Sequence, residues 1–216
     1  MQKVYKAFER FWHWTQAILI LFLALTGFEI HGSYQFLGYR QAVLYHNTAA
    51  IAFLCLIAFA IFWHFTTGGW RQYIPTRQFL SEQVRYYTVG IFHNAPHPTR
   101  TTPLNKLNPL QRLVYLGLKI LVIPVMVVSG LLYMFFRYPQ AKGFVMLAGG
   151  QLVRIALLHT LGAFFLVAFV IAHIYLTTTG ETPVSNLRAM ITGYEDATEE
   201  LDHGAAAVLP AAGEKA

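Results

Sequence analysis

Four stretches of the chain are rich in apolar residues, carry few charges and are long enough to cross a membrane. They run over residues 11–30, 43–65, 111–136 and 153–177. A spanning helix needs roughly 20 such residues, so each stretch predicts one transmembrane helix. Composition agrees, because 56% of residues are hydrophobic and only 12% are charged, a balance typical of a chain whose solvent is lipid. The pattern predicts an all-α membrane protein, a four-helix transmembrane bundle within one domain over residues 1–195.

The connection between the second and third spans, residues 66–109, is longer than most helix connections. Apolar side chains recur in it at helical spacing, at Leu80, Val84, Tyr87 and Ile91. A helix with one such face suits the headgroup layer of a membrane, so we predict a cytoplasmic interfacial helix here. The chain ends in an acidic run followed by alanines, and this composition predicts a disordered tail over residues 196–216.

Lysine and arginine side chains are distributed unevenly around the spans. They gather before the first span and between the second and third, whereas Arg40 is alone between the first and second. Arg137, Lys142 and Arg154, around the connection between the third and fourth spans, oppose this bias but are outnumbered. Positively charged loops stay in the cytoplasm, so we predict that both termini are cytoplasmic. The same asymmetry accounts for the net charge of +6, which therefore does not indicate a nucleic-acid partner.

Five of the nine histidines lie inside or at the rims of the spans: His13, His46, His64, His159 and His173. Ionisable side chains at membrane depth are rare and mark a cofactor, an ion path or a proton relay. His159 and His173 are fourteen residues apart, so a helix places them about 40° apart in azimuth and about 21 Å apart along its axis. His46 and His64 are eighteen residues apart and also share a face. Two spans therefore each present two imidazoles to one side.

Haem suits these histidines better than the other groups that imidazoles bind in membranes. A single such histidine is more often a hydrogen-bonded core residue, but five together favour a functional role. A proton or ion path normally adds buried carboxylates, and Glu29 is the only acidic residue in the spans. A zinc or copper site needs ligands that converge on one point, which two positions about 21 Å apart on one helix do not. Two axial imidazoles from facing helices hold a haem iron without a thiol. With Cys55 as the only cysteine, the C-x-x-C-H attachment of a c-type haem is excluded.

The depth of each histidine predicts how the ligands pair. With both termini inside, His46 and His159 fall near the outer surface, and we call them the outer pair. The inner level holds His13, His64 and His173, one more than a haem uses. His64 lies about one turn deeper than a fourteen-residue spacing would put a ligand. We therefore favour His13 with His173, the inner pair, and keep His64 with His173 as the alternative.

Four motifs resemble one known family, and the resemblance covers all four spans. They are RFWHW at 10–14, YHN at 45–47, KLNPLQR at 106–112 and HTLGAFFLVAFVIAH at 159–173. The chain resembles the transmembrane dihaem b-type cytochrome subunits of bacterial respiratory oxidoreductases: nickel-iron hydrogenases, formate dehydrogenases and thiosulfate reductases. The resemblance implies two haem b groups, with the inner pair as axial ligands of the cytoplasmic haem iron and the outer pair of the periplasmic one. It also implies that Lys106, Asn108 and Gln111 border a menaquinone site.

The function implied by this resemblance is electron transfer within a complex rather than stand-alone catalysis. The chain would be a membrane-anchoring subunit of the bacterial inner membrane that exchanges electrons between the quinone pool, as menaquinone or ubiquinone, and a periplasmic redox partner. That partner would be a multihaem cytochrome c, an iron-sulfur subunit, or a molybdenum or hydrogenase subunit. The alternative is a membrane haem-binding or haem-sensing module without quinone chemistry, and a transition-metal transporter comes third.

His64 is left over once the two pairs are formed. It ends the second span at the boundary where Lys106, Asn108 and Gln111 enter the third, so we expect it to border the same quinone site. Its imidazole titrates near neutral pH and can accept a proton from a quinol. The alternative is that His64 only anchors the helix at the membrane interface, among Trp63 and its neighbours.

Overall fold

The structure is a computed structural model, and it describes residues 2–93, 95, 98–99, 106–137, 149–180 and 182–195. Within this part of the chain, four helices are long and apolar enough to cross a membrane, over Ala7–Ile30, Tyr39–Thr67, Pro109–Phe135 and Gly150–Thr177. The predicted four-helix transmembrane bundle is confirmed. Each helix begins a few residues before the apolar stretch that predicted it, because its first turn includes polar residues.

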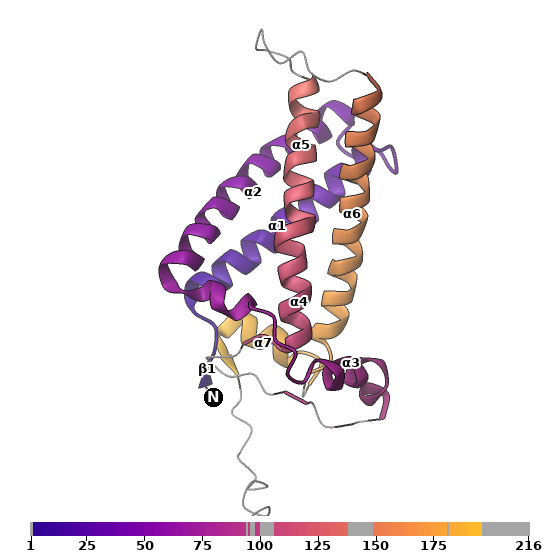
Figure 1. Ribbon diagram of the computed structural model, residues 1–216. Coiled ribbons are helices and arrows are strands. Elements are labelled where there is room, and N and C mark those ends of the chain that lie inside the picture. The colour runs from indigo at the N-terminus through magenta and orange to yellow at the C-terminus, as the bar shows by residue number, and fades with distance from the viewer. Residues whose placement is uncertain are drawn as a thin grey trace, which may run out of the picture.

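The spans are arranged as two antiparallel hairpins (Figure 1). Helix α1 (Ala7–Ile30) packs along α2 (Tyr39–Thr67), and α5 (Ile123–Arg137) packs along α6 (Gly149–Thr177). The third span is one rod built from α4 (Pro109–Gly117), the π-helical turn η3 (Leu118–Val122) and α5. In Figure 1, α1 and α2 lean across the upright pair of α5 and α6.

Many large apolar side chains lie on the outside of the bundle, and several alanines are buried inside it. Ile18, Phe62 and Ile120 are 65%, 62% and 67% exposed, which is the expected state of a side chain that faces lipid. Ala42 and Ala49 of α2 are buried. Helices in lipid associate through close van der Waals contact rather than through exclusion of water, and small residues allow that approach.

The described ends of the chain meet at one end of the bundle, which we call the terminal end. Strand β1 (Gln2–Lys3) pairs antiparallel with β2 (Tyr194–Glu195), and α7 (Ser185–Thr192) lies beside them (Figure 1). The Arg10 guanidinium donates to the backbone oxygen of Ile191, and the Trp14 indole donates to that of Met190 at 3.2 Å. The C-terminal segment thereby fastens the first turns of α1.

The connection between the second and third spans is largely helical. It contains the 3-10 turn η1 (Gly69–Tyr73), helix α3 (Leu80–Thr88) and the 3-10 turn η2 (Gly90–His93), all at the terminal end. A helix therefore lies where the interfacial helix was expected, but its place in the headgroup layer stays a prediction. The domain limit at residue 195 also stays a prediction, and the tail over 196–216 lies outside the described residues.

Glu29, the acidic residue of the predicted spans, closes the connection between α1 and α2. Its side chain is buried, and one carboxylate oxygen, Oε1, accepts the backbone N–H groups of Phe36, Leu37 and Gly38 at 2.8, 2.6 and 2.7 Å. Gly38 is the N-cap of α2, where the helix dipole favours negative charge. In the structure, the carboxylate therefore serves as a structural cap.

We predict that Glu29→Gln lowers the unfolding temperature of the protein by several degrees. The amide keeps an acceptor oxygen but loses the charge that strengthens hydrogen bonds from three N–H groups. Thermal unfolding in detergent, followed by circular dichroism, measures the effect. Glu82→Gln, at an exposed carboxylate on α3, is the matched control and should leave the transition unchanged. Equal transitions for both variants would show that the Glu29 charge does not stabilise this connection.

Candidate haem sites

Two pairs of imidazoles face each other inside the bundle, and each pair joins helices that are distant in sequence. The outer pair brings His46 of α2 and His159 of α6 to a ring-centroid distance of 6.3 Å. The inner pair brings His13 of α1 and His173 of α6 to 6.1 Å. Helix α6 supplies one ring to each pair, so it links the two sites.

The ring separations suit two imidazoles on opposite sides of one metal ion. A ligating imidazole nitrogen lies about 2.0–2.1 Å from its metal and the ring centroid about 1.1 Å behind it, so two opposed rings have centroids about 6.3 Å apart. Both observed distances are close to this value. The described residues hold no cluster of three or more histidine, cysteine or acidic side chains suited to a metal ion. Each pair would therefore suit a haem iron held between its two rings.

The outer pair is oriented by hydroxyl groups. His46 Nδ1 lies 2.9 Å from Thr26 Oγ1 of α1, and His159 Nδ1 lies 3.0 Å from Ser129 Oγ of α5. Metal-ligating histidines usually engage their second ring nitrogen in this way, which fixes the ring orientation. With Nδ1 engaged, Nε2 of each ring is the nitrogen left for an iron.

Glycines beside these hydroxyls make room for the rings. A Cβ atom on Gly27 would lie 3.5 Å from Cε1 of His46, and one on Gly130 would lie 3.1 Å from Cε1 of His159. The second distance is shorter than ordinary van der Waals contact between carbons, which is about 3.5–4.0 Å. Gly130 is therefore needed for the observed approach of α5 to the His159 ring, whereas Gly27 leaves an ordinary contact.

The inner pair has a different environment. The His13 ring lies edge-on to Trp14, with centroids 5.2 Å apart, and the His173 ring stacks on Phe169 at 5.6 Å. His13 Nδ1 is buried and has no hydrogen-bond partner among the described residues. Buried polar atoms are nearly always bonded, so this nitrogen indicates that the site receives a group from outside the described residues.

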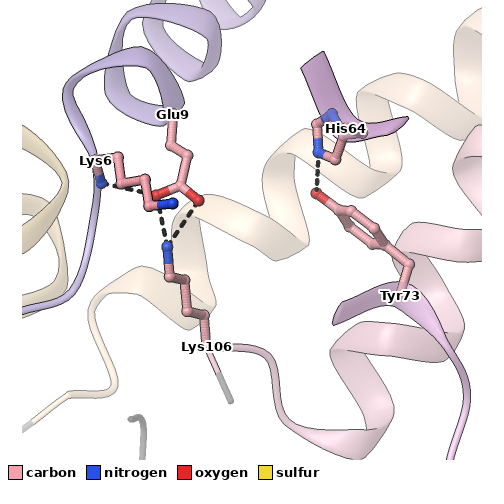
Figure 2. A network of polar contacts seen from close by, with 5 residues as sticks. All are labelled: Lys6, Glu9, His64, Tyr73 and Lys106. Carbon is pink, nitrogen blue, oxygen red and sulfur yellow. Dashed lines mark hydrogen bonds and ion pairs between the residues drawn. The ribbon is translucent and has the colours of Figure 1, made fainter. Parts of the chain in front are cut away.

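His64 belongs to neither pair. Its Nδ1 lies 2.7 Å from the backbone oxygen of Ala60, and its Nε2 lies 3.4 Å from the Tyr73 hydroxyl, which points at the ring in Figure 2. A carbonyl only accepts, so Nδ1 carries the proton and Nε2 accepts from Tyr73 in the neutral ring. Burial raises the pKa of the Tyr73 phenol, which keeps that donor protonated at physiological pH.

Lys106 forms a partly buried ion pair with Glu9 at the start of α1. Its Nζ lies 2.7 and 2.6 Å from the two carboxylate oxygens, as Figure 2 shows. Glu9 also accepts the backbone N–H of Lys6 at 2.7 Å. Of the predicted quinone-site residues, Lys106 therefore contacts α1 directly, and it ties the entrance of the third span to the helix that carries His13.

Asn108 and Gln111 start α4 through a reciprocal capping box. Asn108 Oδ1 accepts the Gln111 backbone N–H at 2.8 Å, and Gln111 Oε1 accepts that of Asn108 at 3.0 Å. Asn108 Nδ2 donates one hydrogen to the Tyr87 hydroxyl at 3.1 Å. Both residues thus have a structural role that the sequence interpretation did not assign, and a second Asn108 amide hydrogen remains as a donor.

Lys119 is a functional candidate that the sequence interpretation missed. It lies in the π turn η3, and its Nζ is 3.5 Å from the Tyr73 ring centroid and 5.0 Å from that of Trp12. Aromatic faces attract a cation, and π turns are frequent at functional sites. The available signal was a lysine well inside an apolar span, but the sequence interpretation rested on histidines and acidic groups there. Trp12 also lies edge-on to His64 at 5.2 Å, so Lys119, Tyr73, Trp12 and His64 form one group, the His64 cluster.

A separate open hollow of about 480 Å³ lies at the terminal end, between α3 with η2 and the end of α6. Tyr86, Phe92 and Tyr175 are among the residues that line it, and none of the five span histidines does. The hollow is therefore distinct from both histidine pairs and from the His64 cluster.

A four-helix membrane bundle with two internal histidine pairs defines the class of membrane b-type cytochromes. The profile of the family described as prokaryotic cytochrome b561 matches residues 4–193, and the chain belongs to this family. It is 32% identical over 200 residues to a protein of Escherichia coli (strain K12) named "Putative cytochrome YdhU". The aligned region covers 88% of this chain and 73% of that protein. No solved structure matches the chain significantly.

The family confirms the resemblance seen in the sequence and the coarser part of the predicted function. The chain is a multi-pass integral membrane protein, a b-type cytochrome of electron transfer that binds haem b. The ring geometry agrees with the pairs expected from depth. Ligation of iron by these histidines, and the number of haems, stay predictions.

We predict that His13→Ala and His46→Ala each remove one of two haems and leave the other, because each site has two axial ligands and loses one. His64→Ala should keep both haems, since its ring is engaged by Ala60 and Tyr73. The pyridine haemochrome assay on purified protein gives haem per chain. Loss of a haem from the His64 variant, with His13 dispensable, would reverse the inner pairing.

Proposed function

We propose that this chain carries electrons between membrane quinone and a periplasmic redox partner through two b-type haems. The observation that carries the proposal is that α6 presents His159 and His173, fourteen residues apart, to ligand partners on two different helices. This spacing puts the two sites about 21 Å apart along the helix. Haem iron takes up and releases one electron at a time, so two sites in series form a path across most of the membrane.

The proposed orientation places the terminal end in the cytoplasm of a bacterial cell and the outer pair near the periplasm. It rests on the distribution of lysine and arginine, which favours cytoplasmic termini. The pairing of β1 with β2 supports placing both ends of the domain on one side. In this orientation the inner pair serves the cytoplasmic leaflet of the inner membrane, and the outer pair lies on the side where a periplasmic partner docks.

We place the quinone site at the terminal end, beside the inner pair. The His64 cluster reaches the inner pair through Trp12, which precedes His13 in the chain and contacts the His64 ring. Lys106, Asn108 and Gln111 lie at the entrance of the same third span that carries Lys119. We therefore take the residues expected from the sequence and the lysine found in the structure to border one region.

The groups in this region suit the chemistry of a quinol. Its oxidation to a quinone releases two electrons and two protons, and the reverse reaction takes up the same number. The His64 ring donates its Nδ1 proton to the backbone oxygen of Ala60, and its Nε2 accepts from the Tyr73 hydroxyl. Nε2 is therefore the atom that takes up a further proton. Lys119 supplies positive charge that stabilises a quinone oxygen as it becomes negative. The second amide hydrogen of Asn108 is a neutral donor for a carbonyl.

Quinol-driven haem reduction tests the function directly. Purified protein under anaerobic conditions is mixed with a reduced naphthoquinone or a reduced benzoquinone, and the haem absorption bands are followed in time. We expect at least one quinol to reduce the haems to a large part of the level reached with dithionite. Full reduction by dithionite with none by either quinol would overturn the proposal and favour a haem-binding or haem-sensing module.

We predict that Lys119→Met slows quinol-driven haem reduction by roughly 100–1,000-fold, the order expected for loss of one preorganised charge. Lys119→Arg should recover most of the rate because it restores the cation. Both variants should retain wild-type haem content, and the exposed Lys3→Met serves as the control. A wild-type rate for Lys119→Met would exclude this lysine from the quinone site.

A further inference from the structure

The hydroxyls beside the outer pair are fully enclosed by protein. Thr26 is 2% exposed and Ser129 is 4% exposed, and both lie within spanning helices. Each hydroxyl contacts an imidazole Nδ1 on another helix, at 2.9 Å for His46 and 3.0 Å for His159. In such surroundings bulk water does not compete for these bonds, so their direction is decided by the chain itself.

The backbone settles which partner donates. Thr26 Oγ1 lies 2.8 Å from the backbone oxygen of Phe22, and Ser129 Oγ lies 2.5 Å from that of Val125. A carbonyl oxygen only accepts, and a hydroxyl has a single hydrogen to give. Each hydroxyl therefore donates to its own helix and accepts from the imidazole. The ring must then carry its proton on Nδ1.

This tautomer has two chemical consequences. It leaves the lone pair on Nε2, the form of the neutral ring in which that nitrogen ligates a metal. In addition, an acceptor on the Nδ1–H group draws the proton and makes the ring a stronger electron donor. A more strongly donating axial ligand favours ferric over ferrous iron, so it lowers the reduction potential.

The same arrangement occurs twice, on different hairpins. In each case a glycine follows the hydroxyl residue, Gly27 after Thr26 and Gly130 after Ser129, and each glycine lies against Cε1 of the same ring that the hydroxyl contacts. Cε1 is bonded to Nδ1, so the glycine opens the approach that the hydrogen bond uses. The inner pair lacks this arrangement at His13, whose Nδ1 has no partner in the described part of the chain.

We propose that Thr26 and Ser129 are positioning residues that hold the outer histidines in the Nδ1–H tautomer and lower the reduction potential of the haem bound between them. This inference rests on the proposed haem at the outer pair, and it adds that these two hydroxyls tune the reduction potential of that haem. Serine and threonine often bond the preceding turn of their own helix without further purpose. Thr48 does so on α2, where its hydroxyl bonds the Leu44 oxygen at 2.9 Å and the side chain is exposed. Thr48 therefore provides a matched control.

Potentiometric titration of the purified, haem-loaded protein tests the proposal. We expect Thr26→Val and Ser129→Ala each to shift the midpoint potential of one haem to a more positive value, and the double variant to shift the same haem further. The other haem should keep its wild-type potential. Thr26→Ser, which restores the acceptor, and Thr48→Val should both titrate like the wild type. Unchanged potentials in the single and double variants, with both haems bound, would overturn the proposal.

Two further outcomes are distinguishable. If Thr26→Val loses haem, Thr26→Cys replaces it, because the cysteine side chain is of similar size and its sulfur is a weaker acceptor. A positive shift of the midpoint potential, smaller than that of Ser129→Ala, supports the inference. A wild-type midpoint potential overturns it. A wild-type protein with a single haem, or a His46→Ala variant that retains both, would instead overturn the assignment of a haem to the outer pair and with it the proposed two-haem path.

Discussion

Inside a lipid bilayer a polar group has no water to bond, and this constraint governs the polar side chains of the spans. Glu29 meets it by accepting three backbone N–H groups at the start of α2. Thr26 and Ser129 meet it by bonding both their own helix and a histidine. Lys119 lies against the rings of Tyr73 and Trp12. His13 Nδ1 does not meet it, because this buried atom has no partner in the described part of the chain.

The two levels of the bundle give their histidine pairs different surroundings. Around the outer pair, hydroxyls and glycines from α1 and α5 determine how the imidazoles lie, and such second contacts tune a metal without taking part in proton exchange. Around the inner pair the chain places aromatic rings, and close by it places groups that carry charge or exchange protons. Under the proposed function, the first environment suits electron transfer alone, and the second suits electron transfer coupled to protons.

Helix α6 connects the two histidine pairs, because it supplies one ring to each. Because His159 and His173 lie on one rigid helix, the distance between the two sites depends on helix geometry rather than on the packing of separate elements. The other histidine of each pair comes from α1 or α2, so the hairpin that these helices form spans both levels. The strand pair β1–β2 and the bonds from Arg10 and Trp14 to α7 then hold the first turns of α1, the helix that carries His13.

The sequence by itself determined the four spans and the shared face of His159 and His173, because hydrophobic length and the 3.6-residue period are local properties of a helix. It also led to the two pairs by depth, since position along a span is nearly a count of residues. The capping box of Asn108 and Gln111 could have been recognised as a local motif before an apolar run, but the family resemblance directed attention to quinone instead.

Only the tertiary structure decided which side chains serve the histidines. Thr26 and His46 are 20 residues apart, and Ser129 and His159 are 30 apart, so their contact depends on how two helices cross and at what depth. Lys119 meets Tyr73 through the π turn and the placement of η1, neither of which follows from local propensity. Partners on separate helices are set by packing, and packing between lipid-facing helices leaves little periodic signal, because apolar side chains face lipid and neighbouring helices alike.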